Sequence, residues 1–220
     1  MSFFPLPRIF LTDLESGADP QVVELGCGDG RFGAVIADAG VRAIGIDRRP
    51  RSCGTAADLV GDVVDPPLLP GSVQVLVAAN LLRHLDLPGP DAVPASWTGL
   101  LRPGGVLWIF EDEPGDATAG AANYADLQSW LARLVPGRSP LLSLASFRDC
   151  FSPGADEGWS FGLAANEYPA SVDGALAVLE PDFGDVEGEA GSLADRIRAD
   201  GLGYGQYWWA RYAPGESRRK

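Results

Sequence analysis

The chain has 220 residues, 46% of them hydrophobic and 21% charged, so it can bury one sizeable core and does not belong to the disordered class. Its 30 acidic and 17 basic residues leave a formal charge of −13 at pH 7, which repels nucleic-acid phosphates and anionic lipid head groups. We therefore expect a single domain over residues 1–220, with neither nucleic acid nor a membrane as its partner.

The cysteines and the N-terminus indicate the compartment. Cys27, Cys53 and Cys150 are widely spaced and include no C-x-x-C pair, which favours neither a disulfide framework nor a zinc site. The opening "MSFFPLPRIF" lacks the long apolar core of a signal peptide, and no apolar run approaches the ~20 residues of a membrane span. We expect a reduced, cytoplasmic protein without a metal ion.

The first half of the chain alternates short apolar runs with helical periods. "QVVELG" predicts a strand, residues 31–40 a helix, and "VRAIGID" a second strand ending at Asp47, which together complete a βαβ unit. Further strands are predicted at "AADLVGD", at "VQVLVAAN" and, after the turn signal "LRPGG", at "VLWIFED". Five strands joined by crossovers predict a doubly wound parallel sheet, so ligands should bind where the strands end.

The second half is less regular. Residues 123–134 and 171–179 predict helices, the latter with Ser171 as N-cap, whereas 141–151 and 159–169 can be extended segments. "FGDVEGEA" and "YGQYWWARYA" predict two last strands that finish the sheet as an antiparallel pair. We thus expect a cofactor-binding core over about 20–112, an inserted substrate lid over 113–170, and a C-terminal helix with the last two strands over 171–213.

The stretch "VVELGCGDGRFG" at residues 22–33 contains two overlapping glycine motifs. Gly26, Gly28 and Gly30 follow Glu24 in a pattern typical of S-adenosylmethionine sites, whereas Gly28, Gly30 and Gly33 fit the dinucleotide pattern. A pyrophosphate needs backbone N–H groups without nearby anions. Because the loop carries Glu24 and Asp29 with only Arg31 to offset them, charge favours the cationic S-adenosylmethionine.

Four motifs in order resemble the class I S-adenosylmethionine-dependent methyltransferases. They are the glycine stretch, "AIGIDRRP", "GDVVDPPLLPGSVQVLVAANLLRHL" and "LRPGGVLWIFEDEP", and they cover about ninety residues. The C-terminal strands resemble the family more weakly. The resemblance implies a Rossmann-like, mostly parallel seven-stranded sheet with an antiparallel C-terminal strand and a lid inserted before the last helix. It also implies S-adenosylmethionine as cofactor and S-adenosylhomocysteine as product.

The resemblance also implies roles for single residues. Glu24 would help to hold the amino-acid end of the cofactor, Asp47 the ribose hydroxyls, and Asp62 with Val63 the adenine. The full set implied for the cofactor is Glu24, Gly26, Cys27, Gly28, Gly30, Asp47, Arg48, Asp62, Val63, Asn80 and Leu81. Other interpretations stay open: a purely structural glycine turn, Asp47 as a helix cap, Asp62 as an ordinary loop carboxylate, and Cys27 as a buried filler.

Methyl transfer is an in-line displacement that depends on positioning and desolvation, with at most one assisting base. His84, the only histidine, follows the fourth strand, where it can act as a base or a substrate contact, or be a helix residue satisfied by a neighbour. Glu111, Asp112 and Glu113 are alternative bases or a solvated loop, and three adjacent acids cannot all face one site.

Aromatic residues are frequent in the expected lid. They can wall a pocket for an aromatic or apolar acceptor, or form the lid's own small core; they are Trp130, Trp159, Phe161 and Tyr168. Trp208 and Trp209 are adjacent on a predicted strand, so they should point to opposite faces of the sheet.

The sequence therefore favours methyl transfer to the oxygen, nitrogen or carbon of a small molecule. One alternative is a nicotinamide-dependent oxidoreductase that uses Gly28, Gly30, Gly33 and Asp47. Another is a protein that binds the cofactor but transfers no methyl group, since a fold does not fix a reaction.

Overall fold

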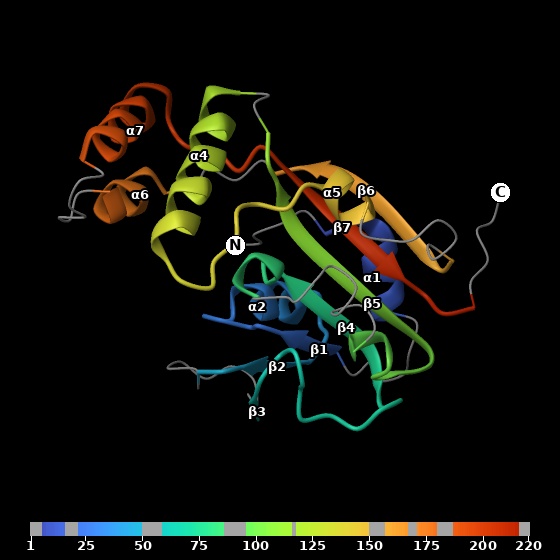
Figure 1. Ribbon diagram of the computed structural model, residues 1–220. Coiled ribbons are helices and arrows are strands. Elements are labelled where there is room, and N and C mark those ends of the chain that lie inside the picture. Colours follow the sequence, from blue (N-terminus) through green and yellow to red (C-terminus); the bar gives the residue numbers. More distant parts are fainter. Residues whose placement is uncertain are drawn as a thin grey trace.

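The structure, a computed structural model, describes residues 6–15, 22–49, 59–85, 96–115, 118–149, 157–166, 171–179 and 187–215. Its centre is a seven-stranded sheet in the order β3-β2-β1-β4-β5-β7-β6 (Figure 1). The strands are β1 (Val22–Leu25), β2 (Ala43–Asp47), β3 (Leu59–Val60), β4 (Val73–Ala79), β5 (Leu101–Glu113), β6 (Trp159–Ala165) and β7 (Gln206–Tyr212). The strands from β1 to β5 pair in parallel, whereas β7 is antiparallel to both β5 and β6. The predicted mostly parallel, doubly wound fold is confirmed.

The order of the strands reverses between β1 and β4. Both are central: all of β1 is buried, and β4 is buried from Val73 to Ala78. Leu25 at the end of β1 lies beside Ile46 of β2 and Ala78 of β4. Three strand ends therefore meet at the switch point, which is where open α/β sheets bind ligands.

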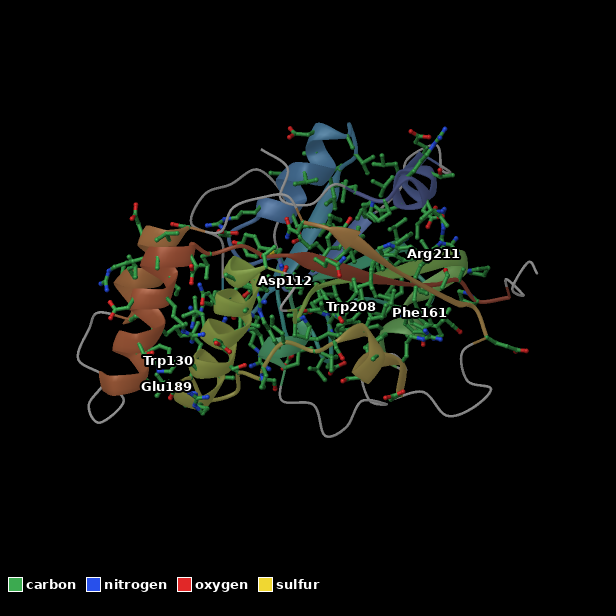
Figure 2. All side chains as sticks on the ribbon, turned by 90° about the horizontal axis from the view of Figure 1, so that it is seen from above. Asp112, Trp130, Phe161, Glu189, Trp208 and Arg211 are labelled. Atoms are coloured by element: carbon green, nitrogen blue, oxygen red, sulfur yellow. The ribbon has the colours of Figure 1, made fainter. Side chains whose placement is uncertain are left out.

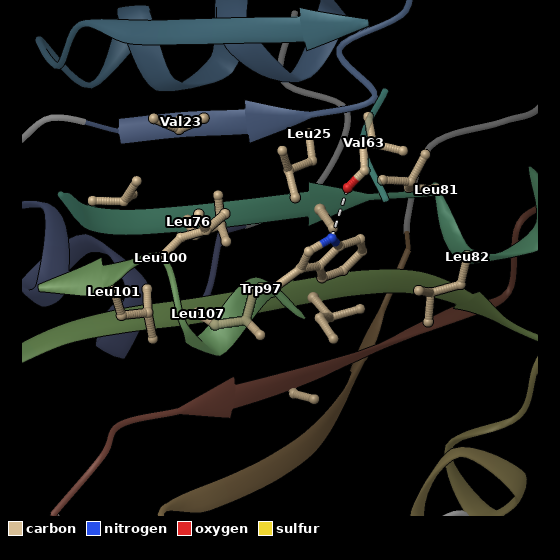
Figure 3. Packing of buried hydrophobic residues seen from close by; sticks show 14 of the residues in the cluster. Val23, Leu25, Val63, Leu76, Leu81, Leu82, Trp97, Leu100, Leu101 and Leu107 are labelled. Atoms are coloured by element: carbon tan, nitrogen blue, oxygen red, sulfur yellow. Dashed lines mark hydrogen bonds between the residues drawn. The ribbon is translucent and has the colours of Figure 1, made fainter. Parts of the chain in front are cut away.

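Helices cover both faces of the sheet. They are α1 (Arg8–Glu15), α2 (Arg31–Asp38), the 3-10 turn η1 (Leu82–His84), α4 (Ala119–Leu134), α5 (Leu144–Asp149), α6 (Val172–Leu179) and α7 (Glu187–Asp200). On the face of α1 and α2, Phe10, Phe32 and Trp108 belong to one buried cluster. On the opposite face Trp97 lies among leucines and donates from Nε1 to the Val63 carbonyl at 2.8 Å (Figure 3).

A third group of helices lies at one end of the sheet. Figure 1 shows α4, α6 and α7 side by side there, and Figure 2 places Trp130 among them. Trp130 of α4 packs in a cluster with Leu179 of α6 and Leu193 and Ile197 of α7. Because this cluster is separate from the two sheet clusters, the three helices form a small layer with a core of its own.

Two predicted strands of the second half are wrong in the residues that the structure describes. Residues 187–190 of the expected strand "FGDVEGEA" begin α7, and residues 183–186 lie outside the described ranges. Ala190, Leu193 and Ile197 recur every three or four positions and are buried, which is the spacing of a helix. The segment 141–151, expected to be extended, contains α5 instead.

The strand that completes the sheet lies earlier in the chain. It is β6 within the predicted extended segment 159–169, so part of the range 113–170 expected as a lid belongs to the sheet. The two tryptophans of β7 do point to opposite faces, as predicted: Trp208 packs in the cluster that contains Trp97, and Trp209 packs against the cluster of Phe10, Phe32 and Trp108. Ser171 caps α6 as predicted, since its Oγ accepts from the Gly174 N–H at 3.0 Å.

The N-terminal helix α1, which the sequence analysis did not predict, is fixed to the sheet by one buried carboxylate. Asp13 accepts from Arg211 of β7 through Nε at 2.7 Å and Nη2 at 3.1 Å, and from Trp108 Nε1 of β5 at 2.8 Å. Both charged side chains are largely buried, at 8% exposure for Arg211 and 14% for Asp13. This pair therefore ties three separate segments together.

Candidate functional site

The turn between β1 and α2 depends on glycine. Gly26, Gly28 and Gly30 have φ angles of 67°, 49° and 81°, a region that other residues rarely adopt. The N–H groups of Gly26 and Cys27 donate to the Ile46 carbonyl at 2.7 and 3.2 Å. A Cβ on Gly26 would lie 2.4 Å from Cδ1 of Leu81, so the end of β4 packs directly on the turn.

Asp47 joins the end of β2 to this turn. Its Oδ2 accepts from the Gly28 N–H at 2.9 Å and its Oδ1 from the Arg49 N–H at 3.0 Å. Each carboxylate oxygen retains a second lone pair for a ligand. The rival interpretation of Asp47 as the cap of a helix concerns residues 50–58, which lie outside the described ranges.

One cavity of about 490 Å³ opens where β1, β4 and β5 end. It brings together most of the predicted residues, namely Glu24, Gly26, Cys27, Gly28, Asp47, Asn80, Leu81 and His84. The predicted residues Gly30, Arg48, Asp62 and Val63 do not line it. The cavity is therefore built from the glycine turn and from two neighbouring strand ends.

Asp62 and its neighbours lie outside the cavity. Arg48 donates from Nη2 to Asp62 Oδ2 at 3.0 Å in an exposed ion pair. The Val64 N–H donates to Asp62 Oδ1 at 2.9 Å, and this bond, with the charge of Arg48, lowers the pKa of Asp62 although slight burial opposes it. Val63 is buried, and its carbonyl is occupied by Trp97.

The opposite side of the cavity is a surface that the sequence analysis did not find. We call it the polar wall; it consists of Arg83, Tyr124, Gln128, Asn166 and Tyr204. These residues come from η1, α4, the end of β6 and the approach to β7. The only sequence signal was the spacing of Tyr124 and Gln128, which places two hydrogen-bonding side chains on one face of a helix.

Asn80 turns the chain between the two halves of the cavity. It has a φ of 52°, a left-handed conformation that asparagine tolerates better than most residues. Its N–H donates to the Phe110 carbonyl at 2.8 Å, and its Oδ1 accepts from the Asp112 N–H at 3.3 Å. The end of β4 is thereby held against β5.

The three adjacent acids of β5 do not form a solvated loop, because Glu111 and Asp112 are each 1% exposed. As predicted, they do not share one site, since only Asp112 lines the cavity. Glu111 Oε1 accepts from the Leu82 N–H at 2.6 Å, and burial raises its pKa to about 7 despite the charge of Arg83. Glu113 Oε2 accepts from the Leu144 N–H at 2.8 Å.

Asp112 organises the polar wall. Its Oδ2 accepts from Tyr124 Oη at 2.7 Å and from Arg83 Nη1 at 3.2 Å. Burial raises the pKa of Asp112, and the charge of Arg83 and the two hydrogen bonds oppose that rise. The side chains of Tyr124 and Arg83 are therefore fixed by one buried carboxyl group.

His84 lines the cavity beside Arg83, whose Nε donates to His84 Nε2 at 3.4 Å. Desolvation of the imidazole and the positive charges of Arg83 and Arg138 lower the pKa of His84 to about 4. The ring is thus neutral at pH 7, but its acidic pKa makes it a weak base.

The aromatic residues of the expected lid do not wall the cavity. Trp130 packs in the cluster of α4, α6 and α7, while Trp159 and Phe161 belong to a sheet-face cluster (Figure 2). Tyr168 lies outside the described residues. Of the two alternatives that the sequence left open, the three described residues follow the packing one: Trp130 packs within the helical cluster, and Trp159 and Phe161 pack on the sheet.

The charges around the glycine turn fit a cationic adenosine cofactor better than a diphosphate. Glu24, Asp29 and Asp47 all line that part of the cavity, and the neighbouring Arg31 forms an ion pair with Asp29. A diphosphate would meet three carboxylates and one arginine that is already paired, whereas an ammonium or sulfonium group would be attracted.

Two further features were sought over the described ranges. There, no group of three or more His, Cys, Asp or Glu side chains is arranged to hold a metal ion. None of the described helices combines the length and apolarity that crossing a bilayer requires.

Comparison with known proteins gives a family for the core of the chain. Residues 23–109 match the model of a methyltransferase domain. This span runs from β1 into β5, so it includes the glycine turn, Asp47 and the end of β4.

Two relatives each match about half of the chain. A ubiquinone biosynthesis O-methyltransferase of Methylococcus capsulatus is 30% identical over 117 residues, which are 48% of this chain and 48% of that protein. A 2-ketoarginine methyltransferase of Streptomyces arginensis is 36% identical over 122 residues, 49% of this chain and 35% of that protein. The chain thus spans less than half the length of these two relatives.

The whole fold has a solved counterpart. The crystal structure of a SAM-dependent methyltransferase from Archaeoglobus fulgidus matches with a TM-score of 0.58 over 94% of this chain and 90% of that one, at 13% identity. At this identity the match concerns the fold alone, and it includes the second half of the chain that the domain model leaves out.

Proposed function

We propose that this chain, which belongs to the class I S-adenosylmethionine-dependent methyltransferases, transfers a methyl group to the oxygen, nitrogen or carbon of a small molecule. The observation that carries the proposal is the single cavity, because the glycine turn lines one side and the polar wall the other. Donor and acceptor would then share one cavity, as a direct transfer requires.

The residues of the glycine turn would hold the cofactor, S-adenosylmethionine. Gly26 and Gly28 allow its close approach to the backbone, and Glu24 and Asp47 offer carboxylates to its amino-acid end and to its ribose. When bound, S-adenosylmethionine supplies a methyl group activated by a positively charged sulfur. Arg48, Asp62 and Val63 do not line the cavity, so their proposed role is limited to its outer, adenine end.

The chain's own contribution to the chemistry would be positioning and exclusion of water. Asp112 holds two residues of the polar wall, Arg83 and Tyr124, so an acceptor bound to these would meet fixed hydrogen-bonding groups. His84 stays a candidate contact to the acceptor, although its pKa of about 4 disfavours it as a general base at pH 7. Glu111 has a more suitable pKa of about 7 but does not line the cavity.

The volume of the cavity and the names of the relatives both support a small acceptor. The cavity of about 490 Å³ has the size of a small-molecule site. The two curated relatives described above carry the names of enzymes for ubiquinone biosynthesis and for 2-ketoarginine.

The nicotinamide alternative has less support. Its glycine pattern needs Gly33, which lies within α2 rather than in the turn. Its diphosphate would also have to displace Asp29 from Arg31.

Calorimetric titration separates these functions. We expect S-adenosylhomocysteine to bind and NAD not to bind, because the cofactor end of the cavity is anionic. Binding of NAD without S-adenosylhomocysteine would refute the proposal. Incubation with methyl-labelled S-adenosylmethionine and a metabolite panel then tests transfer, and cofactor binding without labelled product would favour a non-catalytic cofactor-binding protein.

A further inference from the structure

We propose that the methyl acceptor carries a carboxylate, and that Arg83, Gln128 and Tyr204 bind it at the polar wall with Arg138 behind them. This inference rests on the proposed methyl transfer and specifies its substrate class. It follows from the hydrogen bonds and charges of the wall rather than from any relative.

The wall offers hydrogen-bond donors that the described residues leave unused. Arg83 employs Nη1 and Nε in its contacts to Asp112, Tyr124 and His84, and its Nη2 makes no hydrogen bond within the described ranges. Gln128 accepts from Arg138 through Oε1, which leaves its NH2 group without a partner among the same residues.

The Tyr204 hydroxyl likewise makes no hydrogen bond to the described residues, and its ring packs edge-on against Tyr124. All these side chains line the cavity, so their free donors can meet a ligand. An acceptor group with two oxygens and several lone pairs, such as a carboxylate, matches such a set.

The charges of the wall point to the same chemistry. Arg83 is balanced by Asp112, but Arg138 forms no ion pair with the described residues and is hydrogen-bonded to the neutral Gln128. The Arg138 Nε is buried without a hydrogen-bond partner in the described part of the chain. Burial and the charge of Arg83 both lower the pKa of Arg138.

Asp112, together with the charge of Glu111, therefore balances Arg83, whereas Arg138 has no carboxylate partner among the described residues. An anion from the acceptor would compensate the charge of Arg138. The positive charge of the cofactor in the same cavity would attract that anion further.

An acceptor that presents a cation or a strong donor is less suited to this wall. Among the described residues, Asp112 is the carboxylate that lines the cavity beside the polar wall. Its Oδ2 already accepts hydrogen bonds from Tyr124 and Arg83. Its Oδ1 has no hydrogen-bond partner among the described residues, but this atom is buried and cannot be reached from the cavity. At the wall, a ligand amine would find neutral acceptors such as the Tyr204 hydroxyl oxygen, beside the positive charge of Arg83, but no free carboxylate oxygen among the described residues.

The test uses the intact protein saturated with S-adenosylhomocysteine. Short hydroxy, keto and amino acids, each paired with its primary amide and with the matching amine, are titrated at up to about 10 mM, and binding is followed by thermal shift and calorimetry. We expect at least one acid to bind about tenfold or more tightly than its amide. The inference is overturned if amides or amines bind as well as the acids, or if no acid binds the complex.

Variants identify the groups responsible. Arg83→Lys keeps the charge opposite Asp112 but removes the free Nη2, and we expect it to weaken binding of the acid about tenfold. Arg138→Gln, at a less buried position, should weaken binding of the acid several-fold. Arg133→Gln is the matched control, since Arg133 is an exposed arginine of α4 that pairs with Glu189 and lies away from the cavity.

Cofactor affinity serves as the readout of folding. Variants that still bind S-adenosylhomocysteine normally but bind the acid as tightly as the unmodified protein would overturn the inference. If the unmodified protein fails to bind S-adenosylhomocysteine, the proposed function itself fails. If the unmodified protein methylates only neutral acceptors, the proposed function stands and the inference that the acceptor carries a carboxylate is wrong.

Discussion

Replacement of Asp47 by alanine is expected to weaken the binding of S-adenosylhomocysteine without unfolding the protein. The carboxylate is half-buried at the rim of the cavity, where it holds the N–H groups of Gly28 and Arg49. Water can replace it at these N–H groups because both bonds are exposed. The main loss would therefore be its charge-assisted hydrogen bonds to the ribose.

Such bonds contribute roughly 1.5–3 kcal/mol, so the dissociation constant should rise by about 10- to 150-fold. Calorimetric titration measures this directly, and Asp47→Asn should recover part of the affinity because an amide oxygen still accepts one bond. Asp38→Ala on the exposed end of α2 is a control with the same change of charge. If Asp47→Ala binds as tightly as Asp38→Ala, the ribose assignment is refuted.

Further predictions concern other parts of the structure. Gly26→Ala places a Cβ 2.4 Å from Leu81 Cδ1 and also strains the backbone, so this variant should lose unfolding free energy and cofactor affinity. Gly40→Ala is the control and should lose less, because Gly40 has a φ of 79° but no atom within 4 Å of such a Cβ. Equal losses in urea unfolding and calorimetry would contradict the packing argument. Asp13→Ala removes one partner of the largely buried ion pair between α1 and β7 and should reduce the unfolding free energy by about 3–5 kcal/mol. A loss below about 1 kcal/mol in urea unfolding would show that the pair is dispensable. Burial raises the pKa of Glu111 to about 7, so the folded state favours the protonated form of this acid. Its contribution to the unfolding free energy is therefore complete below the ordinary glutamate pKa and is lost as the pH rises through about 7. Glu111→Gln should therefore gain stability relative to the unmodified protein between pH 5 and about pH 8, and an unchanged difference in urea midpoints across that range would count against it. His84→Ala should reduce turnover at pH 7 by less than about tenfold with unchanged cofactor affinity, whereas a loss of a hundredfold or more in the labelled-product assay would identify a general base.

The part of the cavity that the glycine turn lines was predictable because its determinants are local in sequence. Glycines after a buried strand and acids at successive strand ends imply a shared edge as soon as the sheet is parallel. The cavity indeed brings Glu24, Asp47 and Asn80 together, although these residues come from different strands.

The polar wall was not predictable in the same way. Gln128, Asn166 and Tyr204 come together only through the packing of α4 and the pairing of β6 with β7. The sequence analysis placed the last two strands at 183–190 and 204–213, because these segments follow the helix predicted at 171–179 and resemble, more weakly, the last two strands of the family. It therefore missed that β6, and with it Asn166, forms the sheet edge. The burial of Asp112 could not be predicted either, because it depends on an ion pair with Arg83, which lies 29 positions away in the sequence.

The two halves of the cavity are lined by residues that are distributed differently along the sequence. The donor side comes from one continuous stretch, residues 24–81, whereas the opposing side is assembled from single positions far apart, such as Tyr124, Asn166 and Tyr204. Under the proposed function, point changes at the scattered positions would alter which acceptor binds, while the glycine turn that would hold the cofactor stays intact.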